Sequence, residues 1–133
     1  MNEKELALSA IKARETAYAP YSEFYVGAAL LCSDGTVFTG CNIENISYSA
    51  TVCAERTAFF KAVSEGKREF SAIAIAGGKK GESIFAYPCG VCRQVMREFC
   101  SDDFLVILGN KNLEYKEYKL SEILPLSFDK QFL

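Results

Sequence analysis

The most informative stretches of this chain are Cys53-Ala54-Glu55 and Pro88-Cys89-Gly90-Val91-Cys92, and the sequence contains no histidine. Thiolates are soft ligands that select zinc or an iron–sulfur cluster. Three of them leave one position of a tetrahedral zinc ion open, whereas a structural site closes it with a fourth protein ligand. Glu55 lies two residues from a cysteine, so a carboxylate can sit beside that position. The combination predicts a hydrolytic zinc centre with Cys53, Cys89 and Cys92 as ligands and Glu55 as the catalytic acid–base group.

The spacing of the cysteines favours two helix starts around the metal. Cys89 and Cys92 are three residues apart, so both sulfurs project to one face of a first helical turn, and Pro88 suits the start of that turn. If Cys53 also begins a helix, two positive helix ends lower the pKa of the thiols. Three thiolates leave the zinc complex with a net negative charge. Arg56 is placed to donate hydrogen bonds to a ligand sulfur and withdraw some of that charge.

Cysteine pairs also occur in redox proteins, structural zinc modules and disulfide-bonded proteins. The rest of the sequence distinguishes this chain from each of these classes. A redox dithiol typically follows an early strand, which is not where the second stretch lies. A structural zinc module would need a fourth cysteine, such as Cys32, Cys41 or Cys100. These three are more typical of small buried hydrophobic side chains. Three disulfides would need an oxidising compartment, and six cysteines without an export signal indicate reduced thiols.

Composition limits the partners of the chain. Half of its 133 residues are hydrophobic, which suits the packed core of a single domain over residues 1–133. The net charge is −2 and the only adjacent basic pairs are Lys67-Arg68 and Lys79-Lys80, so no nucleic-acid partner is expected. Residues 1–5 contain no signal-peptide core, and no apolar run approaches about 18 residues. We therefore expect a cytoplasmic protein without a membrane partner.

Hydrophobic periodicity and turn residues predict the order of the elements. We expect helices over residues 3–17, 53–65 and 90–100, and a helical turn over 121–124. We expect strands over 26–32 and 36–41, joined by a turn at 33–35, and over 70–76, 104–109 and 113–119. The strand over 70–76 is near-continuously apolar, as in strands buried on both faces, and Gly77-Gly78 are expected to end it. A hairpin followed by alternating helices and strands predicts an α/β fold with a mixed sheet between helical layers.

The chain resembles the small cytidine deaminases, which are zinc deaminases of nucleobases with a His-or-Cys, Glu and Pro-Cys-x-x-Cys signature. The resemblance spans nearly the full length and is carried by YSEFYVGAA (21–29), GCNIEN (40–45), TVCAERTA (51–58) and YPCGVCRQ (87–94). It implies a cytidine deaminase-like three-layer sandwich with a five-stranded mixed sheet between helices. Cys53 stands where the dimeric branch has histidine, and the branch with three cysteine ligands is typically homotetrameric. The resemblance therefore implies one zinc ion per subunit and a homotetramer.

The resemblance also assigns substrate-binding roles. Asn42 and Glu44 match the family's Asn-x-Glu pair, which hydrogen-bonds the ribose hydroxyls. An amide and a carboxylate on one face of an extended segment supply suitable donors and acceptors. Phe24 corresponds to the ring that packs against the base, and the backbone N–H of Ala54 is expected to meet the pyrimidine O2. Without the resemblance, polar groups at a strand end are more typical of the solvated surface. An aromatic residue before a strand is more typical of the core.

The C-terminal stretch ILPLSF (123–128) is similar to the family's Leu-Leu-Pro-x-x-Phe close. In tetrameric members this Phe reaches a neighbouring subunit's pocket, so Phe128 is expected to complete a site in trans; otherwise it covers its own subunit. Tyr48 is a second candidate contact between subunits. Tyr87 departs from the pattern, because many relatives have Ser or Thr there. A side chain that lines the pocket would affect substrate preference.

The implied reaction is hydrolytic deamination of cytidine and 2′-deoxycytidine to uridine and 2′-deoxyuridine, with release of ammonia, as in pyrimidine salvage. The closest alternative is a deaminase of another aminopyrimidine, similar to blasticidin-S deaminase. A nucleotide substrate is disfavoured, because no glycine-rich loop or basic cluster near the motifs offers a phosphate site. The alternative from another class is a non-catalytic zinc module that binds nucleosides or proteins.

Overall fold

A computed structural model describes residues 1–133. The helices are α1 (Glu3–Ala13), α2 (Ala54–Ser64), α3 (Gly90–Phe99) and α4 (Leu120–Ile123). The strands are β1 (Tyr25–Cys32), β2 (Val37–Cys41), β3 (Phe70–Gly78), β4 (Leu105–Gly109) and β5 (Tyr115–Lys119). Three single turns of 3₁₀ helix lie at Arg14–Thr16, Tyr48–Ala50 and Lys130–Phe132. No helix has the length and apolar character that crossing a membrane requires.

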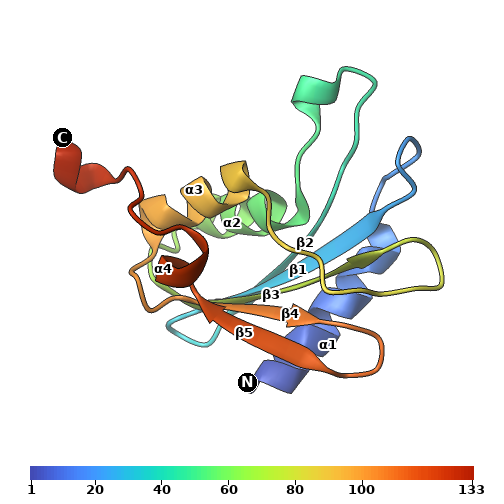
Figure 1. Cartoon of the computed structure of the whole chain (residues 1–133), viewed down its shortest axis with the longest axis horizontal. Helices are drawn as coiled ribbons and strands as arrows, with labels where there is room; N and C mark the ends of the chain where they lie inside the picture. Colours follow the sequence, from blue (N-terminus) through green and yellow to red (C-terminus); the bar gives the residue numbers. More distant parts are fainter.

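The five strands form one mixed sheet in the order β2-β1-β3-β4-β5 (Figure 1). β1 pairs antiparallel with both β2 and β3, β3 pairs parallel with β4, and β5 closes the other edge antiparallel to β4. The only parallel pair is the one whose crossover contains α3, because parallel neighbours need a long connection whereas hairpins join antiparallel ones. This connection leaves the start of α3 beyond the carboxyl end of β3.

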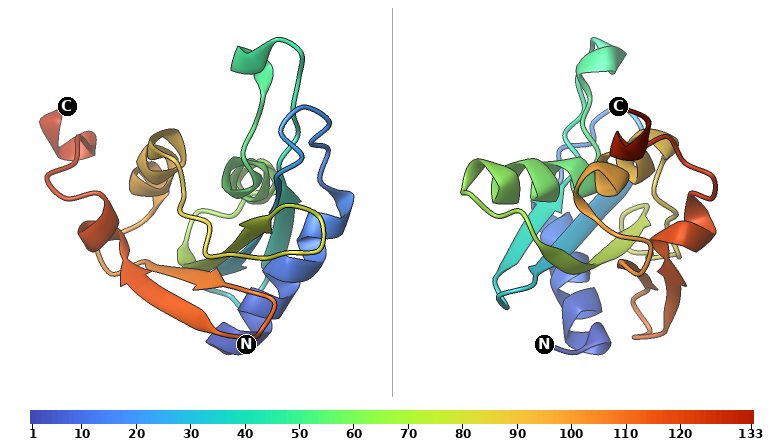
Figure 2. Two further views of the ribbon diagram at one scale, coloured as in Figure 1. Left: turned by 45° about the vertical axis from the view of Figure 1, so that its right-hand side comes forward. Right: turned by 90° about the vertical axis from the view of Figure 1, so that its left-hand side faces the viewer.

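Helices cover both faces of the sheet (Figure 2), with α1 on one side and α2 and α3 on the other. Strand alternation sorts the side chains between the two faces. In β3, Ala72, Ala74 and Ala76 pack with α1, whereas Ile73 and Ile75 belong to the core under α2 and α3. The expected three-layer α/β fold with a five-stranded mixed sheet is therefore confirmed.

Two glycines allow the helices to approach the sheet closely. A Cβ atom at Gly27 in β1 would lie 2.1 Å from the carbonyl oxygen of Ala10 in α1. A Cβ atom at Gly40 in β2 would lie 2.5 Å from the carbonyl oxygen of Ala54 in α2. Neither distance is possible for real atoms, so both contacts depend on the missing side chain. The second contact sets the position of the helix that begins next to Cys53.

Two predicted boundaries are wrong for tertiary reasons. The helix expected over 3–17 ends at Ala13, and a 3₁₀ turn follows. Arg14 there extends its guanidinium to the carbonyl oxygens of Tyr25 and Gly78, at 2.8 and 2.9 Å. The strand expected over 70–76 continues through Gly78, because β1 supplies pairing partners for both glycines. The β5 strand begins at Tyr115 rather than 113, and the last helical turn is shifted by one residue.

Candidate active site

Three cysteine sulfurs meet where α2 and α3 begin. Cys53 is the N-cap of α2, Cys89 is the N-cap of α3, and Cys92 is buried in the first turn of α3. Their Sγ atoms all lie within 4.8 Å of one another, and those of Cys53 and Cys89 are 3.6 Å apart. Zinc–sulfur bonds of about 2.3 Å in a tetrahedron place two sulfurs about 3.8 Å apart. The donor set and its spacing therefore fit zinc.

The group contains three sulfurs and no fourth metal-binding side chain. Cys32, Cys41 and Cys100, the candidates for a structural fourth ligand, do not join it. Structural zinc sites are closed by four protein ligands, whereas catalytic sites have three. The arrangement matches the catalytic pattern.

Charge on the cluster is stabilised locally. The pKa of Cys53 is lowered to about 5, because Cys92 and then Arg56 donate hydrogen bonds to its sulfur. The same hydrogen bond with Cys53, and then burial, raise the pKa of Cys92. Nη2 of Arg56 lies 3.3 Å from the Cys53 sulfur, and this contact raises the pKa of the guanidinium. The predicted contact between Arg56 and a ligand sulfur is present in the structure.

Glu55 is almost fully buried, with 4% of its surface exposed. Burial, and then the charge of Cys53, raise the pKa of its carboxyl group to about 7. A carboxyl group that titrates near neutrality can both accept and donate a proton at physiological pH. Strong perturbation of this kind, in a cavity, is typical of a catalytic group.

A cavity of about 170 Å³ lies beside the cysteines and brings most of the predicted residues together. The predicted residues that line it are Phe24, Asn42, Cys53, Ala54, Glu55 and Cys89, together with Tyr87. The backbone N–H of Ala54 belongs to the first turn of α2, where N–H groups have no partner within the helix. Five residues that the sequence analysis did not select also line it: Val26, Thr51, Val52, Ile75 and Ala86. They are apolar or small, and no local signal distinguishes them from core residues.

The Asn-x-Glu pair lies in the extended segment after β2, and both side chains bond nearby backbone. Asn42 accepts from the N–H of Val26 at 2.9 Å and donates to the carbonyl oxygen of Phe24 at 2.8 Å. Glu44 accepts from the backbone N–H groups of Tyr21 and Ser22 at 2.9 and 3.1 Å, and from the Ser22 hydroxyl. An amide has two donors and an acceptor with two lone pairs, and a carboxylate has about four acceptor sites. Asn42 thus retains one donor and one acceptor site, and Glu44 retains about one acceptor site.

Glu44 and Tyr48 do not line the cavity that contains Glu55. They line a neighbouring hollow of about 350 Å³ with Tyr21 and Ser22. Tyr48 lies on the segment between β2 and α2, which projects from the body of the subunit (Figure 1), and 77% of its surface is exposed. The Tyr21 ring contacts the Tyr48 ring edge-on, with centroids 6.4 Å apart.

Phe128 also lies outside the cavity of its own chain. It is 63% exposed and stacks on Phe132, with ring centroids 5.5 Å apart. Phe128 is not among the side chains of the core or among those packed against it, so in one subunit this ring does not cover the core. The side chains of Arg93 and Gln94, which were not predicted as site residues, bond the C-terminal segment.

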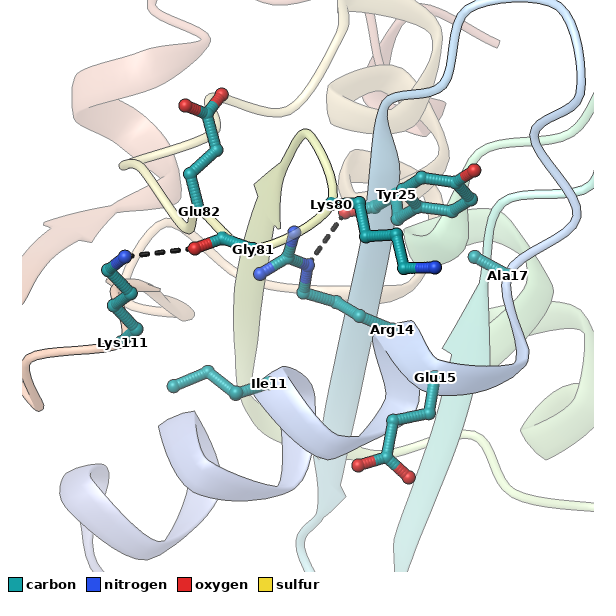
Figure 3. A pocket seen from close by; sticks show the side chains of 9 residues that line it. All are labelled: Ile11, Arg14, Glu15, Ala17, Tyr25, Lys80, Gly81, Glu82 and Lys111. Atoms are coloured by element: carbon teal, nitrogen blue, oxygen red, sulfur yellow. Dashed lines mark hydrogen bonds between the residues drawn. The ribbon is translucent and has the colours of Figure 1, made fainter.

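The largest hollow in the subunit, about 520 Å³, lies on the α1 side of the sheet and contains none of the predicted site residues (Figure 3). Its lining mixes basic and acidic groups: Arg14, Lys80, Lys111, Glu15 and Glu82. Lys111 donates to the carbonyl oxygen of Gly81 at 2.9 Å and Arg14 bonds the ends of β1 and β3, so two of its three cations are engaged by backbone. Although this hollow has a larger volume than the cavity beside the cysteines, it lacks the predicted catalytic residues and is not the candidate reaction site.

Comparison with known proteins supports the interpretation of the three-cysteine group as the zinc site of a deaminase. The profile of the family described as "Cytidine and deoxycytidylate deaminase zinc-binding region" matches residues 1–108. A protein named cytidine deaminase from Sporosarcina psychrophila is 50% identical over 133 residues, covering 100% of this chain and 96% of the relative. Another from Halalkalibacterium halodurans is 53% identical over 128 residues, covering 96% and 95%. The chain belongs to the cytidine and deoxycytidylate deaminase family.

Solved structures agree with the fold. The crystal structure of cytidine deaminase from Burkholderia pseudomallei has a TM-score of 0.88 and 47% identity, covering 96% of this chain and 100% of that one. The crystal structure of cytidine deaminase from Mycobacterium tuberculosis has a TM-score of 0.82 and 38% identity, covering 96% and 98%. The family resemblance stated from the sequence motifs is thereby confirmed.

Proposed function

We propose that this chain is a single-domain hydrolase of residues 1–133 that converts cytidine and 2′-deoxycytidine to uridine and 2′-deoxyuridine with release of ammonia. The observation that carries the proposal is the juxtaposition of three cysteine sulfurs and the buried Glu55 carboxyl at one small cavity. Cys53, Cys89 and Cys92 would hold one zinc ion per subunit. When bound, the zinc supplies Lewis acidity that lowers the pKa of water next to the base.

Glu55 moves the protons of the reaction. Its carboxylate accepts a proton from the attacking water and delivers it to N3 of the ring. It then accepts the remaining proton of the new C4 hydroxyl, as the C4 carbonyl forms, and passes it to the amino group, which leaves as ammonia. One carboxyl group can serve first as base and then as acid because its pKa lies near neutrality. The apolar wall around it, which includes Val26 and Ile75, keeps bulk water away from the carboxyl.

Base and sugar are bound by residues that line the cavity of Glu55 and by Glu44 in the neighbouring hollow. The Phe24 ring packs against the base, and the backbone N–H of Ala54 donates to the pyrimidine O2. Asn42 and Glu44 use their remaining hydrogen-bonding capacity on the ribose hydroxyls. Their bonds to β1 and to the loop before it hold both side chains in place before the nucleoside binds, which lowers the entropy cost of binding.

We further propose a homotetramer in which neighbouring subunits complete each site. Support comes from large apolar side chains that one subunit leaves in water on its two projecting segments: Ile46, Tyr48, Leu126 and Phe128, all more than 60% exposed. Phe128 and Tyr48 would contact the site of a neighbour. We place the enzyme in the cytoplasm, in pyrimidine salvage, because reduced thiolates are the zinc ligands and free nucleosides the substrates.

Metal analysis together with an ultraviolet assay of cytidine deamination tests the proposal. We expect about one zinc per subunit and a loss of the cytidine absorbance band with release of ammonia. The Glu55→Gln variant should keep its zinc and lose at least about 10²-fold in kcat, because the amide moves no proton. A non-catalytic zinc module would hold zinc without releasing ammonia. Activity on blasticidin S and none on cytidine would show that the substrate is another aminopyrimidine and not cytidine.

A further inference from the structure

Two neighbouring side chains of α3 hold the segment that follows α4. Nη1 of Arg93 donates to the carbonyl oxygen of Ile123 at 2.7 Å, and Nε2 of Gln94 donates to the carbonyl oxygen of Phe128 at 2.8 Å. Ile123 is the last residue of α4. The segment 124–127 is thus tied at both ends to a single turn of α3, past which it runs in Figure 1. Both contacts use backbone carbonyls, so they set the path of the chain and leave the Phe128 ring free to contact another group.

Arg93 makes a further contact on the side of the cysteines. Its Nε donates to the carbonyl oxygen of Pro88 at 2.8 Å, and its own backbone N–H donates to the carbonyl oxygen of Cys89 at 3.0 Å. Pro88 is buried and directly precedes the N-cap of α3. The Arg93 side chain therefore bridges the turn that presents Cys89 and the point where the C-terminal segment leaves α4.

The chemistry of this bridge requires arginine. The half-buried guanidinium forms no ion pair with a carboxylate, and two carbonyl oxygens are the partners that hold it. A guanidinium presents several N–H groups in a rigid planar fork, whereas lysine carries one ammonium on a flexible stem. Hydrogen bonds from a charged donor are also roughly twice as strong as neutral ones. Only the fork can orient Nε toward one segment and Nη1 toward the other.

We propose that Arg93 and Gln94 are positioning residues for deamination and that they position different segments of the chain. Arg93 positions both the Cys89 turn and the C-terminal segment, whereas Gln94 positions only the C-terminal segment at Phe128. The inference rests on the proposed function, since the segment matters to the reaction only through Phe128. It follows that loss of Gln94 weakens nucleoside binding alone, and loss of Arg93 weakens both nucleoside binding and zinc retention.

Four variants test this division: Arg93→Met, Arg93→Lys, Gln94→Met and the control Arg68→Met. Nη1 of Arg68 also donates to two backbone carbonyls, those of Val63 and Lys67, both at 2.8 Å, but at the end of α2 opposite to Cys53. For each protein we would measure the half-time of zinc loss to excess chelator with a metal-binding dye. KM, kcat and the unfolding temperature complete the comparison.

We expect Arg93→Met to lose zinc roughly 10-fold faster than the parent, the usual scale for groups that support metal ligands. Gln94→Met should keep the parental half-time and kcat and raise KM about threefold to tenfold, the worth of one hydrogen bond. Arg68→Met should change neither quantity. If Arg93 and Gln94 had a purely structural role, Arg93→Met and Gln94→Met would both have a lower unfolding temperature. They would not differ in which of zinc retention and KM each one changes.

The proposal is overturned if Arg93→Met retains zinc as long as the parent, or if Gln94→Met has an unaltered KM. It is also overturned if Arg93→Lys behaves as the parent, because a single point charge would then suffice. The Arg93→Lys variant keeps the question answerable should Arg93→Met fail to fold. The proposed function fails in a distinguishable way: the unmodified protein would not deaminate cytidine, while the zinc half-times would still report on Arg93.

Discussion

Nη2 of Arg56, in the first turn of helix α2, lies 3.3 Å from Sγ of Cys53, the N-cap of the same helix. The contact joins a cation to a thiol whose pKa is lowered, because Cys92 and then Arg56 donate hydrogen bonds to its sulfur. With three thiolates around one zinc ion, the ligands carry more negative charge than the metal neutralises. We propose that Arg56 offsets part of this excess and so keeps a bound zinc ion electrophilic enough to acidify water.

We therefore expect Arg56→Gln to lower zinc affinity or kcat by roughly 10- to 100-fold, the range observed when outer partners of metal ligands are removed. Zinc affinity is measured by competition with a chelating dye, and kcat at saturating zinc. Lys61→Met is the matched control, since Lys61 is a cation of the same helix that bonds the carbonyl oxygen of Thr39 and no sulfur. Unaltered zinc affinity and kcat in Arg56→Gln would remove Arg56 from the site.

Local sequence signals predicted the elements that carry the metal. The start of α3 follows from the cysteine spacing and the helix at 53–65 from its apolar stripe, and the structure places Cys53 and Cys89 at the two N-caps. The Cys-x-x-Cys pair depends only on i and i+3 positions sharing one face of a helix, which is a local property. The alternation in β3 likewise divides its side chains between the two cores without reference to the rest of the chain.

Features that depend on distant contacts were not predictable in this way. Gly77 and Gly78 are typical strand breakers, yet they remain in β3 because Val26 and Tyr25 pair with them. The loop before β1 supplies the N–H groups that bind Glu44, and nothing in residues 42–44 indicates this partner. The direction of the C-terminal segment depends on Arg93, whose side chain reaches a carbonyl thirty residues away. In each case tertiary contacts override or add to the local preference.

A subunit-mixing experiment tests whether Phe128 acts in trans. Phe128→Ala should raise KM with little change in zinc content, and Glu55→Gln should be inactive. When the two variants are unfolded together and refolded as mixed tetramers, some sites combine Glu55 of one subunit with Phe128 of another. The KM of the recovered activity should then return to the parental value at those sites. If Phe128 acts on its own subunit, every active site of the mixture lacks the ring and the KM stays raised.

The turn between β1 and β2 should make stability depend on pH through Asp34. Its carboxylate accepts from Nζ of Lys67 at 2.7 Å and from the backbone N–H of Thr36 at 2.9 Å, which holds the pKa of Asp34 well below its usual range. A lowered pKa contributes stability that is fully present above the unfolded value of about 3.9, and this contribution is lost progressively as the pH falls from there through the lower pKa of the folded state. The pair is exposed, so the effect is small and screened by salt.

We expect Asp34→Asn to be less stable than the parent at pH 7 in low salt, and the difference to shrink only as the pH falls from about 4 toward about 2. Urea unfolding of both proteins at about pH 7, 4 and 2 measures the difference, and comparing them cancels the titration of all other groups. Repeating the pH 7 measurement in 1 M salt should shrink the gap, since the Debye length falls to about 3 Å. A stability difference that stays constant over the whole pH range would contradict the assignment to the Asp34 carboxylate.

The close approach of α2 to β2 makes Gly40 a determinant of the metal site. A Cβ atom there would lie 2.5 Å from the carbonyl oxygen of Ala54 and 2.6 Å from the backbone nitrogen of Ala58. Both atoms belong to the backbone of α2, so no side-chain movement relieves the clash. Gly40→Ala must therefore displace the helix whose N-cap is Cys53. We expect the free energy of unfolding to fall by about 1–3 kcal/mol, as in other overpacked interiors, and zinc to be lost faster to chelator.

Gly90→Ala is the matched control for this substitution, because it adds the same methyl group to another helix start where nothing lies within 4 Å of the new atom. Its stability and zinc half-time should equal those of the parent protein. If Gly40→Ala were as stable as Gly90→Ala and held zinc equally long, the sheet would not determine where α2 begins. The position of Cys53 would then have to come from the contacts of its sulfur with Arg56 and Cys89 alone.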